Sequence, residues 1–137
     1  MPLNIIIPCY NESTRLPVNK YLDFLKLNKQ VKIIFVDDGS TDNTKNLVNK
    51  LSNKFPKQIK ILSYKKNKGK GNAVRDGFLY AVHENMSGNL AYLDADLSTS
   101  LEECKLLSEK ISDKIKFVFG SRIPKSNNII KRKFHRF

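Results

Sequence analysis

Two carboxylates lie one residue apart at the end of an apolar segment. Residues 90–96 read Leu-Ala-Tyr-Leu-Asp-Ala-Asp, so Asp94 and Asp96 follow a run that is typical of a β-strand. Residues i and i+2 of an extended chain project from the same face, so both carboxylates can converge on one point beyond the strand. Mg²⁺ usually takes one or two protein carboxylates and fills its other positions with water and substrate phosphates. The pair therefore indicates a site for Mg²⁺ or Mn²⁺ with a nucleotide diphosphate, although acids at such positions also serve as caps and turn formers.

Polar residues also follow two earlier apolar segments. Pro8-Cys9-Tyr10-Asn11-Glu12 comes after the first, and Asp37-Asp38-Gly39-Ser40 comes after the second. Carboxylates in the second loop could accept hydrogen bonds from a base or a ribose, while Gly39 permits a tight turn and Ser40 can cap a helix. A turn and an N-cap alone would explain the same residues, and the sequence leaves both interpretations open.

A glycine- and lysine-rich loop, Lys68-Gly69-Lys70-Gly71, precedes a predicted helix. Backbone N–H groups and lysines at a helix N-terminus suit a phosphate group, and the alternative for Lys68 is a flexible basic loop. The loop is not a Walker motif, because Gly71 stands where that motif needs Ser or Thr. It is not a dinucleotide fingerprint, because Val74 stands where the third glycine should be. An ATPase and a NAD enzyme are therefore disfavoured.

Five short segments that are almost wholly apolar are predicted as strands: 3–7, 31–36, 58–64, 90–93 and 116–119. Continuous apolar strands indicate burial on both faces, as in a parallel sheet covered by helices. Segments with helical periodicity lie between them. The alternation predicts an α/β fold with a mostly parallel, doubly wound sheet and helices on both faces. Ligands bind beyond the carboxyl ends of the strands in such sheets, which is where the polar loops lie.

The predicted helices each have an apolar face. One buries Leu47, Val48 and Leu51, and another, about 72–83, is expected to bury Val74, Phe78, Ala81 and Val82. A further helix begins at Ser100, whose spacing to Glu103 is that of a capping box, and is expected to bury Leu101, Cys104, Leu107 and Ile111.

Composition favours one cationic domain. The chain has 137 residues and a formal net charge of +12, which indicates an anionic partner such as a nucleotide, a nucleic acid or an acidic membrane surface. Its two cysteines lack the spacing of a zinc site. Neither a signal peptide nor an apolar run of membrane-spanning length is evident, so the chain is expected to be cytoplasmic, with the cytoplasmic face of a membrane as a further option.

The polar motifs occur in an order that resembles family 2 glycosyltransferases. The motifs that carry the resemblance are 8–12, 37–44, 67–75, 94–96 and 120–122. Asp94-Ala95-Asp96-Leu97-Ser98-Thr99 together with the Gly-Lys-Gly segment is most similar to the dolichyl-phosphate or polyprenyl-phosphate glucosyltransferase branch. The resemblance implies a Rossmann-like GT-A fold and inverting transfer of a hexose from a nucleotide-diphosphate sugar, with UDP-glucose favoured as the donor.

The resemblance also assigns roles to residues. Pro8, Tyr10, Glu12 and Asp38 would hold the base and ribose, with Asp37 a weaker candidate. Asp96 would be the principal ligand of Mg²⁺ or Mn²⁺, and Asp94 would share the metal or approach the ribose. Arg122 would face a phosphate, and Lys70 and Arg75 would stabilise the departing diphosphate. The implied nucleotide-sugar site comprises Pro8, Tyr10, Glu12, Asp37, Asp38, Lys70, Arg75, Asp94, Ala95 and Asp96, and the implied catalytic residues are Asp94, Asp96 and Arg122.

The resemblance implies a division of the chain as well. Residues 1–123 would form the N-terminal part of a nucleotide-sugar-binding GT-A domain, and 124–137 a basic C-terminal segment. Catalytic domains of the family continue past the equivalent of Arg122, so the chain is expected to be a truncated domain. One interpretation of residues 125–137 is peripheral contact with an anionic membrane, and the other is a disordered basic tail.

The resemblance also suggests an acceptor, and the sequence weighs against two other functions. The branch implies a polyprenyl or dolichyl phosphate acceptor, and the alternative is a sugar hydroxyl of a cell-surface polysaccharide. A nucleic-acid-binding module would use the net charge, but the acidic strand ends would repel a phosphate backbone, so no nucleic acid is expected. A sugar-1-phosphate nucleotidyltransferase should have a glycine-rich loop after its first strand, and residues 8–12 contain no glycine.

Overall fold

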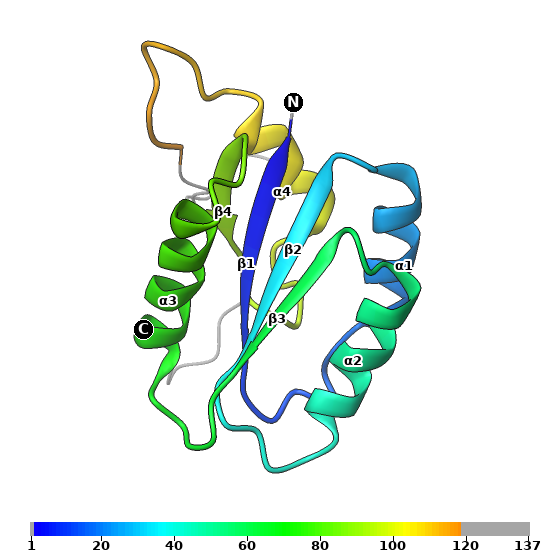
Figure 1. Ribbon diagram of the computed structural model, residues 1–137. Coiled ribbons are helices and arrows are strands. Elements are labelled where there is room, and N and C mark those ends of the chain that lie inside the picture. Colours follow the sequence, from blue (N-terminus) through cyan, green and yellow to red (C-terminus); the bar gives the residue numbers. More distant parts are fainter. Residues whose placement is uncertain (1, 119–137) are drawn as a thin grey trace, which may run out of the picture.

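The computed structural model describes residues 2–118 as one parallel sheet covered by helices (Figure 1). The elements in chain order are β1 (Leu3–Cys9), α1 (Val18–Leu27), β2 (Val31–Asp37), α2 (Thr44–Lys54), β3 (Ile59–Ser63), α3 (Lys70–His83), β4 (Asn89–Tyr92) and α4 (Leu101–Ser108). The strands lie in the order β3-β2-β1-β4, and each neighbouring pair is parallel. This confirms the predicted α/β class and the doubly wound parallel sheet.

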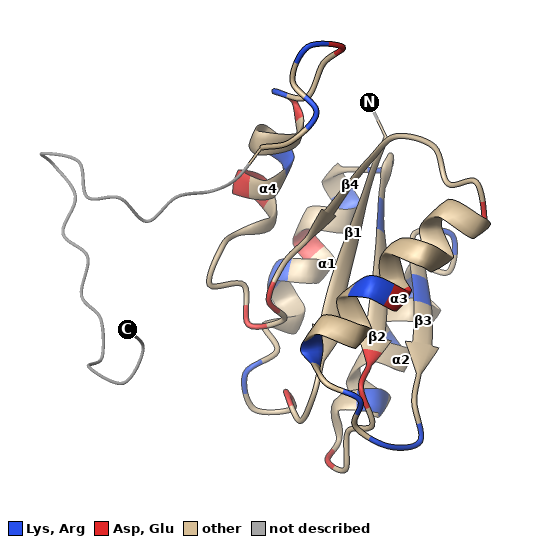
Figure 2. Ribbon diagram, turned by 90° about the vertical axis from the view of Figure 1, so that its left-hand side faces the viewer, with Lys and Arg blue, Asp and Glu red and all other residues tan. Residues whose placement is uncertain are grey.

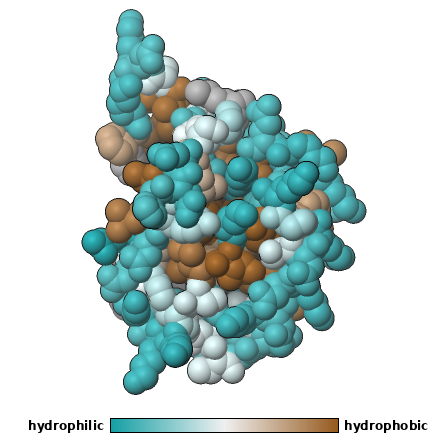
Figure 3. All heavy atoms as spheres, viewed as in Figure 1, coloured by the Kyte–Doolittle hydropathy of each residue, from teal (hydrophilic) through white to brown (hydrophobic). Residues whose placement is uncertain are grey.

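The central strands are buried on both faces, as their apolar sequences predict. Every residue of β1 is buried, and so is every residue of β2 except Lys32. Ile5 and Phe35 face the side covered by α1, α2 and α4, whereas Ile6 and Ile34 face α3. Each fully buried isoleucine contributes roughly 1.5–3 kcal/mol relative to an exposed one, so β1 and β2 make a large contribution to the stability of the fold. Hydrophilic residues cover most of the side shown in Figure 3, and apolar residues reach that surface in a smaller area.

α3 packs on the sheet mainly through small residues, which confirms the predicted burial of Ala81 but corrects another part of the predicted face. Ala73, Gly77 and Ala81 are its buried residues, whereas Val82 is 63% exposed. A Cβ atom at Gly77 would lie 2.5 Å from Cγ2 of Ile6, so the helix backbone approaches β1 more closely than a larger residue allows. The buried face is therefore set by side-chain size as well as by hydropathy. The prediction from hydropathy missed Ala73 and Gly77, so the predicted face is rotated relative to the observed one.

The C-terminal part of the described chain departs further from the predictions. The capping box is confirmed, because the Glu103 backbone N–H donates to Ser100 Oγ at 3.0 Å. α4 nevertheless ends at Ser108, so Ile111 lies beyond it. Residues 116–118 form no strand, contrary to the predicted fifth strand, and Phe119 lies outside the described residues. An apolar run becomes a strand only when a neighbouring strand pairs with its backbone N–H and C=O groups, and within residues 2–118 this run has no such neighbour.

None of the helices within residues 2–118 combines the length and the hydropathy that a membrane span requires.

Candidate functional site

A polar cavity of about 240 Å³ lies at the carboxyl ends of the central strands. Its walls come from the loop after β1, the end of β2, the start of α3 and the loop after β4. The lining residues are Pro8, Cys9, Tyr10, Glu12, Arg15, Asp38, Lys70, Asp94, Ala95 and Asp96. The structure thus brings together eight of the residues that the resemblance assigned to a nucleotide-sugar site, and adds Cys9 and Arg15 to them. Figure 2 shows acidic and basic residues interspersed at this end of the sheet.

The loop after β4 presents the two aspartates. Leu93 N–H still bonds to Ile6 C=O at 3.1 Å, which extends the alignment with β1 to the start of the loop. The chain then turns tightly, with Leu97 N–H donating to Asp94 C=O at 3.0 Å. Leu97 has φ +55°, a conformation that is costly for a branched side chain, and its burial among core residues holds it there. Packing of Leu97 in the core therefore fixes the conformation of the turn that carries both aspartates.

Asp94 and Asp96 differ in their partners. The Lys70 ammonium group forms an ion pair with Asp94 Oδ1, and both side chains remain partly exposed. Lys70 also lies 6.0 Å from the centroid of the Tyr92 ring. Asp96 is exposed, and its Oδ1 accepts a hydrogen bond from Ser98 N–H at 3.0 Å. A cation from α3 thus already lies beside one aspartate, and the other is the more open to a further cation.

Glu12 is a largely buried acid that lines the same cavity. Its side chain is 16% exposed, and Arg15 Nη2 donates to Oε1 at 3.1 Å. Arg15 Nε is also 3.1 Å from Oε2, but the angle there makes an ion pair without a hydrogen bond. Burial raises the pKa of the Glu12 carboxyl; Arg15 opposes this, and Asp96 and Asp94 reinforce it. Glu12 Oε2 is therefore a buried acceptor, a suitable partner for a hydroxyl group of a ligand.

Asp38 uses its carboxylate to hold the loop that precedes α3. Its Oδ1 accepts from Lys68 N–H at 2.6 Å, and its Oδ2 accepts from Gly69 N–H and Asn67 Nδ2, each at 3.0 Å. Gly39 makes this contact possible, because its φ is +71° and an added Cβ would lie 2.5 Å from the Asn67 nitrogen. Asp38 therefore lines the cavity and at the same time positions the start of α3, which carries Lys70.

Asp37 takes no part in the cavity lining. It is 2% exposed at the end of β2, and its Oδ1 accepts from Ser40 N–H at 3.2 Å. Asp37 therefore serves as a turn former, one of the two roles that the sequence left open for this motif.

The loops after β1 and β2 are joined by hydrogen bonds. Asn11 Oδ1 accepts from Thr41 N–H at 2.8 Å, and Glu12 N–H donates to Thr44 Oγ1 at 2.7 Å. The Asp42 carboxylate accepts from Ser13 and Thr44. Burial alone would raise the pKa of Asp42, but these hydrogen bonds outweigh it and hold that pKa well below its usual range. The polar residues of 40–44 therefore fix the loop that carries Tyr10 and Glu12.

Cys9 lines the cavity but is poorly suited to act as a nucleophile. Burial, with smaller contributions from Glu12 and Asp37, raises the pKa of its thiol well above the ordinary value. Only the thiolate is strongly nucleophilic, so this buried Cys9 acts as a packing residue of the core.

Of the residues assigned by the resemblance, Arg75 lies away from the cavity. The Arg75 guanidinium is exposed on α3, 3.6 Å from Asp76 Oδ1, and does not line the cavity. Arg122 lies outside the described residues.

Residues 4–137 match the family described as "Glycosyl transferase family 2". The chain belongs to this family. A dolichyl-phosphate beta-glucosyltransferase of Dictyostelium discoideum is 36% identical over an alignment of 150 residues, which covers 98% of this chain and 44% of the relative. The enzyme of the same name from Saccharomyces cerevisiae is 35% identical over 119 residues, which covers 80% of this chain and 34% of the relative. This family 2 chain thus spans less than half the length of both relatives.

A solved structure supports the fold of this family 2 chain. The crystal structure of S. aureus TarS 1–349 is similar with a TM-score of 0.50 and 24% identity, over 70% of this chain and 28% of that one. Together with the family match, this confirms the GT-A fold expected from the motifs. Family membership also sets aside the nucleic-acid-binding module and the nucleotidyltransferase.

The donor atoms of the family 2 chain's cavity fit a divalent cation. Asp94 and Asp96 offer the carboxylate oxygens that Mg²⁺ and Mn²⁺ prefer. Within residues 2–118, no group of three or more His, Cys, Asp and Glu side chains is arranged around one point. Two carboxylates leave most positions of an octahedral ion to water and to a ligand's phosphates, as is usual for Mg²⁺ bound with a nucleotide.

Proposed function

We propose that this chain binds the donor of a glucosyltransferase, UDP-glucose, together with Mg²⁺ or Mn²⁺, for inverting transfer of glucose to a polyprenyl or dolichyl phosphate. The observation that carries the proposal is the convergence of Asp94, Asp96, Lys70 and Glu12 on one cavity at the carboxyl ends of parallel strands. The names of the relatives support the donor sugar and the acceptor.

Two parts of the cavity would make different contacts, one with the base and ribose and the other with the cation and diphosphate. Tyr10 is 44% exposed at the mouth, which leaves a ring face available for a nucleotide base. Glu12 supplies a buried acceptor for a ribose hydroxyl. Asp96, with Asp94, would hold the cation, which when bound supplies Lewis-acid neutralisation of the diphosphate. Base and ribose would therefore lie along the β1 loop, and the diphosphate near the loop after β4.

Lys70 is placed to assist departure of the nucleoside diphosphate. In the transfer, a phosphate oxygen of the acceptor forms a bond to C1 of glucose while the bond from C1 to the diphosphate oxygen breaks, and the departing group carries away the electron pair. A lysine beside that group stabilises the charge that develops on it. The acceptor phosphate is already anionic, so this reaction requires no general base.

Membrane contact is part of the same proposal. A lipid-phosphate acceptor would bring the chain to the cytoplasmic face of a membrane, and the basic segment 125–137, which lies outside the described residues, would contact anionic headgroups. Sedimentation with vesicles should show binding that increases with the phosphatidylserine fraction and disappears when residues 125–137 are deleted. Equal binding to neutral vesicles would contradict this part.

Donor binding is tested by calorimetric titration of the chain with UDP, UDP-glucose and GDP-mannose, each with and without Mn²⁺. UDP-glucose and UDP should bind more tightly with Mn²⁺, and Asp96→Asn should remove the metal-dependent increase. Asp23→Asn, which alters an exposed acid on α1 away from the cavity, is the matched control and should bind as the wild type does. A metal-dependent increase that survives in Asp96→Asn would overturn the assignment.

A further inference from the structure

Tyr21 connects the core to the aspartate turn, although it does not line the cavity. It lies on α1, is fully buried, and donates a hydrogen bond from its hydroxyl group to Ala95 C=O at 2.8 Å. Ala95 is the residue between Asp94 and Asp96. The hydroxyl group therefore contacts the backbone of the turn that carries both carboxylates, 74 residues further along the chain.

The position of the Tyr21 ring is tightly determined. It packs edge-on against Phe35 of β2, with the ring centroids 5.4 Å apart and an interplanar angle of 61°. Burial raises the pKa of the Tyr21 hydroxyl well above its ordinary value, which favours the protonated form that donates this hydrogen bond. A hydroxyl group held in this way supplies a fixed anchor for the backbone atom that it contacts.

The Ala95 carbonyl group needs such an anchor. Ala95 is 3% exposed, so water has little access to its backbone oxygen. The peptide unit that contains this oxygen also leads directly into Asp96. Rotation of this unit would swing the Asp96 side chain relative to Asp94, and the other bonds of the turn involve Asp94 C=O and Asp96 Oδ1, not this oxygen.

We infer that Tyr21 is a positioning residue, whose hydroxyl group fixes the peptide between Ala95 and Asp96 so that the two carboxylates are preorganised for a divalent cation bound with a diphosphate. The inference rests on the proposed function for the identity of the ligand. Its structural half, that the hydroxyl group orders the aspartate turn, stands independently of any ligand.

Tyr21→Phe tests the structural half first, because it removes one oxygen atom and keeps the ring. Amide hydrogen exchange of the ligand-free chain should accelerate in 95–98 by more than in β1 and β2. Val48→Ala, a core change on α2 away from the cavity, is the control for general loss of stability and should accelerate exchange without singling out 95–98. Equal acceleration of 95–98 in both variants, or none in Tyr21→Phe, would overturn the inference. Should Tyr21→Phe not fold, Phe35→Leu loosens the ring while keeping the hydroxyl group, and the same local effect is expected.

The ligand half is tested by titrating Mn²⁺ into the chain saturated with UDP. Tyr21→Phe should weaken Mn²⁺ binding roughly tenfold, the lower end of the range for residues that support metal ligands from outside the ligand shell. Binding of UDP without metal should change less than about twofold, because the β1 loop is unaltered. Wild-type affinity for Mn²⁺ in Tyr21→Phe would refute the ligand half. Absence of metal-dependent UDP binding in the wild type would refute the proposed function instead, and the exchange experiment would still decide the role of Tyr21.

Discussion

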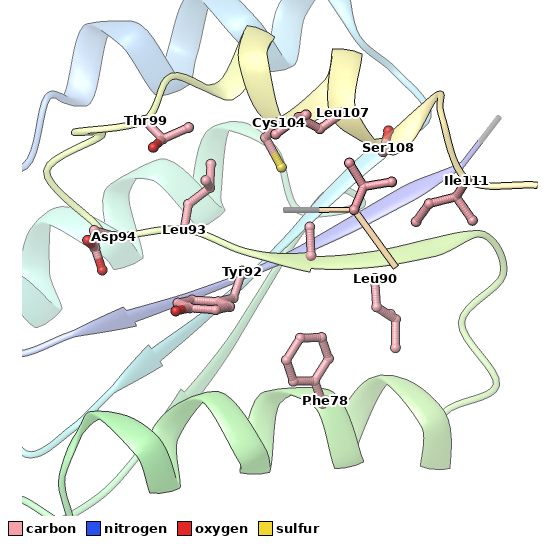
Figure 4. A pocket seen from close by; sticks show the side chains of 12 residues that line it. Phe78, Leu90, Tyr92, Leu93, Asp94, Thr99, Cys104, Leu107, Ser108 and Ile111 are labelled. Atoms are coloured by element: carbon pink, nitrogen blue, oxygen red, sulfur yellow. The ribbon is translucent and has the colours of Figure 1, made fainter. Parts of the chain in front are cut away.

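Two cavities meet at Asp94, and their walls differ in chemistry. The polar cavity of about 240 Å³ is lined by three acids besides Asp94 and by two cationic side chains. The other cavity, about 360 Å³, is lined mainly by apolar side chains of α3, β4 and α4, among them Phe78, Leu90 and Leu107 (Figure 4). Among the residues that the structure describes, the larger cavity has no comparable set of charged groups. Convergent charge from several loops therefore identifies the candidate site better than volume does.

The two cavities are also built in different ways. Hydrogen bonds accepted by the side-chain oxygens of Asp38, Asn11 and Asp42 connect the loops around the polar cavity, so its shape is maintained without a ligand. The apolar cavity lies beside β4, which within residues 2–118 pairs only with β1. Its walls are held by side-chain packing, which adapts more readily than a connected set of hydrogen bonds. Substitutions should accordingly separate into those that impair binding and those that lower stability.

The largest expected effect concerns Gly39, which lets the loop after β2 approach the loop before α3. Gly39→Ala should lower the free energy of unfolding by roughly 2–4 kcal/mol, because a Cβ would lie 2.5 Å from the Asn67 nitrogen at a backbone φ of +71°. Gly71→Ala is the matched control: nothing lies within 4 Å of its added Cβ, and alanine favours the first turn of α3. Urea denaturation of both variants measures the difference. Similar losses in the two would show that the cavity does not depend on the Gly39 contact.

One substitution in each cavity tests whether the polar cavity serves binding and the apolar cavity serves stability. Lys70→Met should weaken metal-dependent UDP binding roughly tenfold with little change in stability, because exposed ion pairs contribute little to folding. Phe78→Ala should lower the free energy of unfolding by about 2 kcal/mol, since Phe78 is partly buried against the core, and should leave UDP binding unchanged. Calorimetry and urea denaturation of both variants are needed. The reverse pattern would move the candidate site to the apolar cavity.

The smallest expected effect depends on pH. The folded-state pKa of Asp42 is lowered by its hydrogen bonds, so this carboxylate adds stability above its unfolded pKa of about 4, and that stability is lost as the pH falls through the folded-state value. Asp42→Asn should therefore cost roughly 0.5–1 kcal/mol at pH 7, and the difference from wild type should shrink below about pH 4. Thermal unfolding between pH 7 and pH 3 measures this. A difference that is constant over that range would mean that the Asp42 charge does not connect the two loops.

Local patterns were sufficient to predict β1, β2, β3 and β4 and the polar loops that follow the strands. The apolar runs at β1 and β2 follow directly from burial on both faces, and the capping box at Ser100 depends on residues three apart. The face of α3 was predicted only in part: Ala81 is buried and Phe78 packs against the core, but Gly77 was missed because its fit against Ile6 depends on a contact between distant segments. The strand predicted at 116–119 is absent from 116–118, because pairing requires a partner that no local pattern specifies.

The amino-acid sequence by itself determined the order of strands and helices, the buried strands, and the acids, glycines and lysines that lie at the strand ends. The tertiary structure decided what those residues contact. It directs the Asp38 carboxylate to the loop before α3, pairs Lys70 with Asp94, and connects Tyr21 to Ala95. The physical reason is that periodicity and capping act over a few residues. These contacts, by contrast, join segments 24 to 74 residues apart, and they depend on the strand order β3-β2-β1-β4.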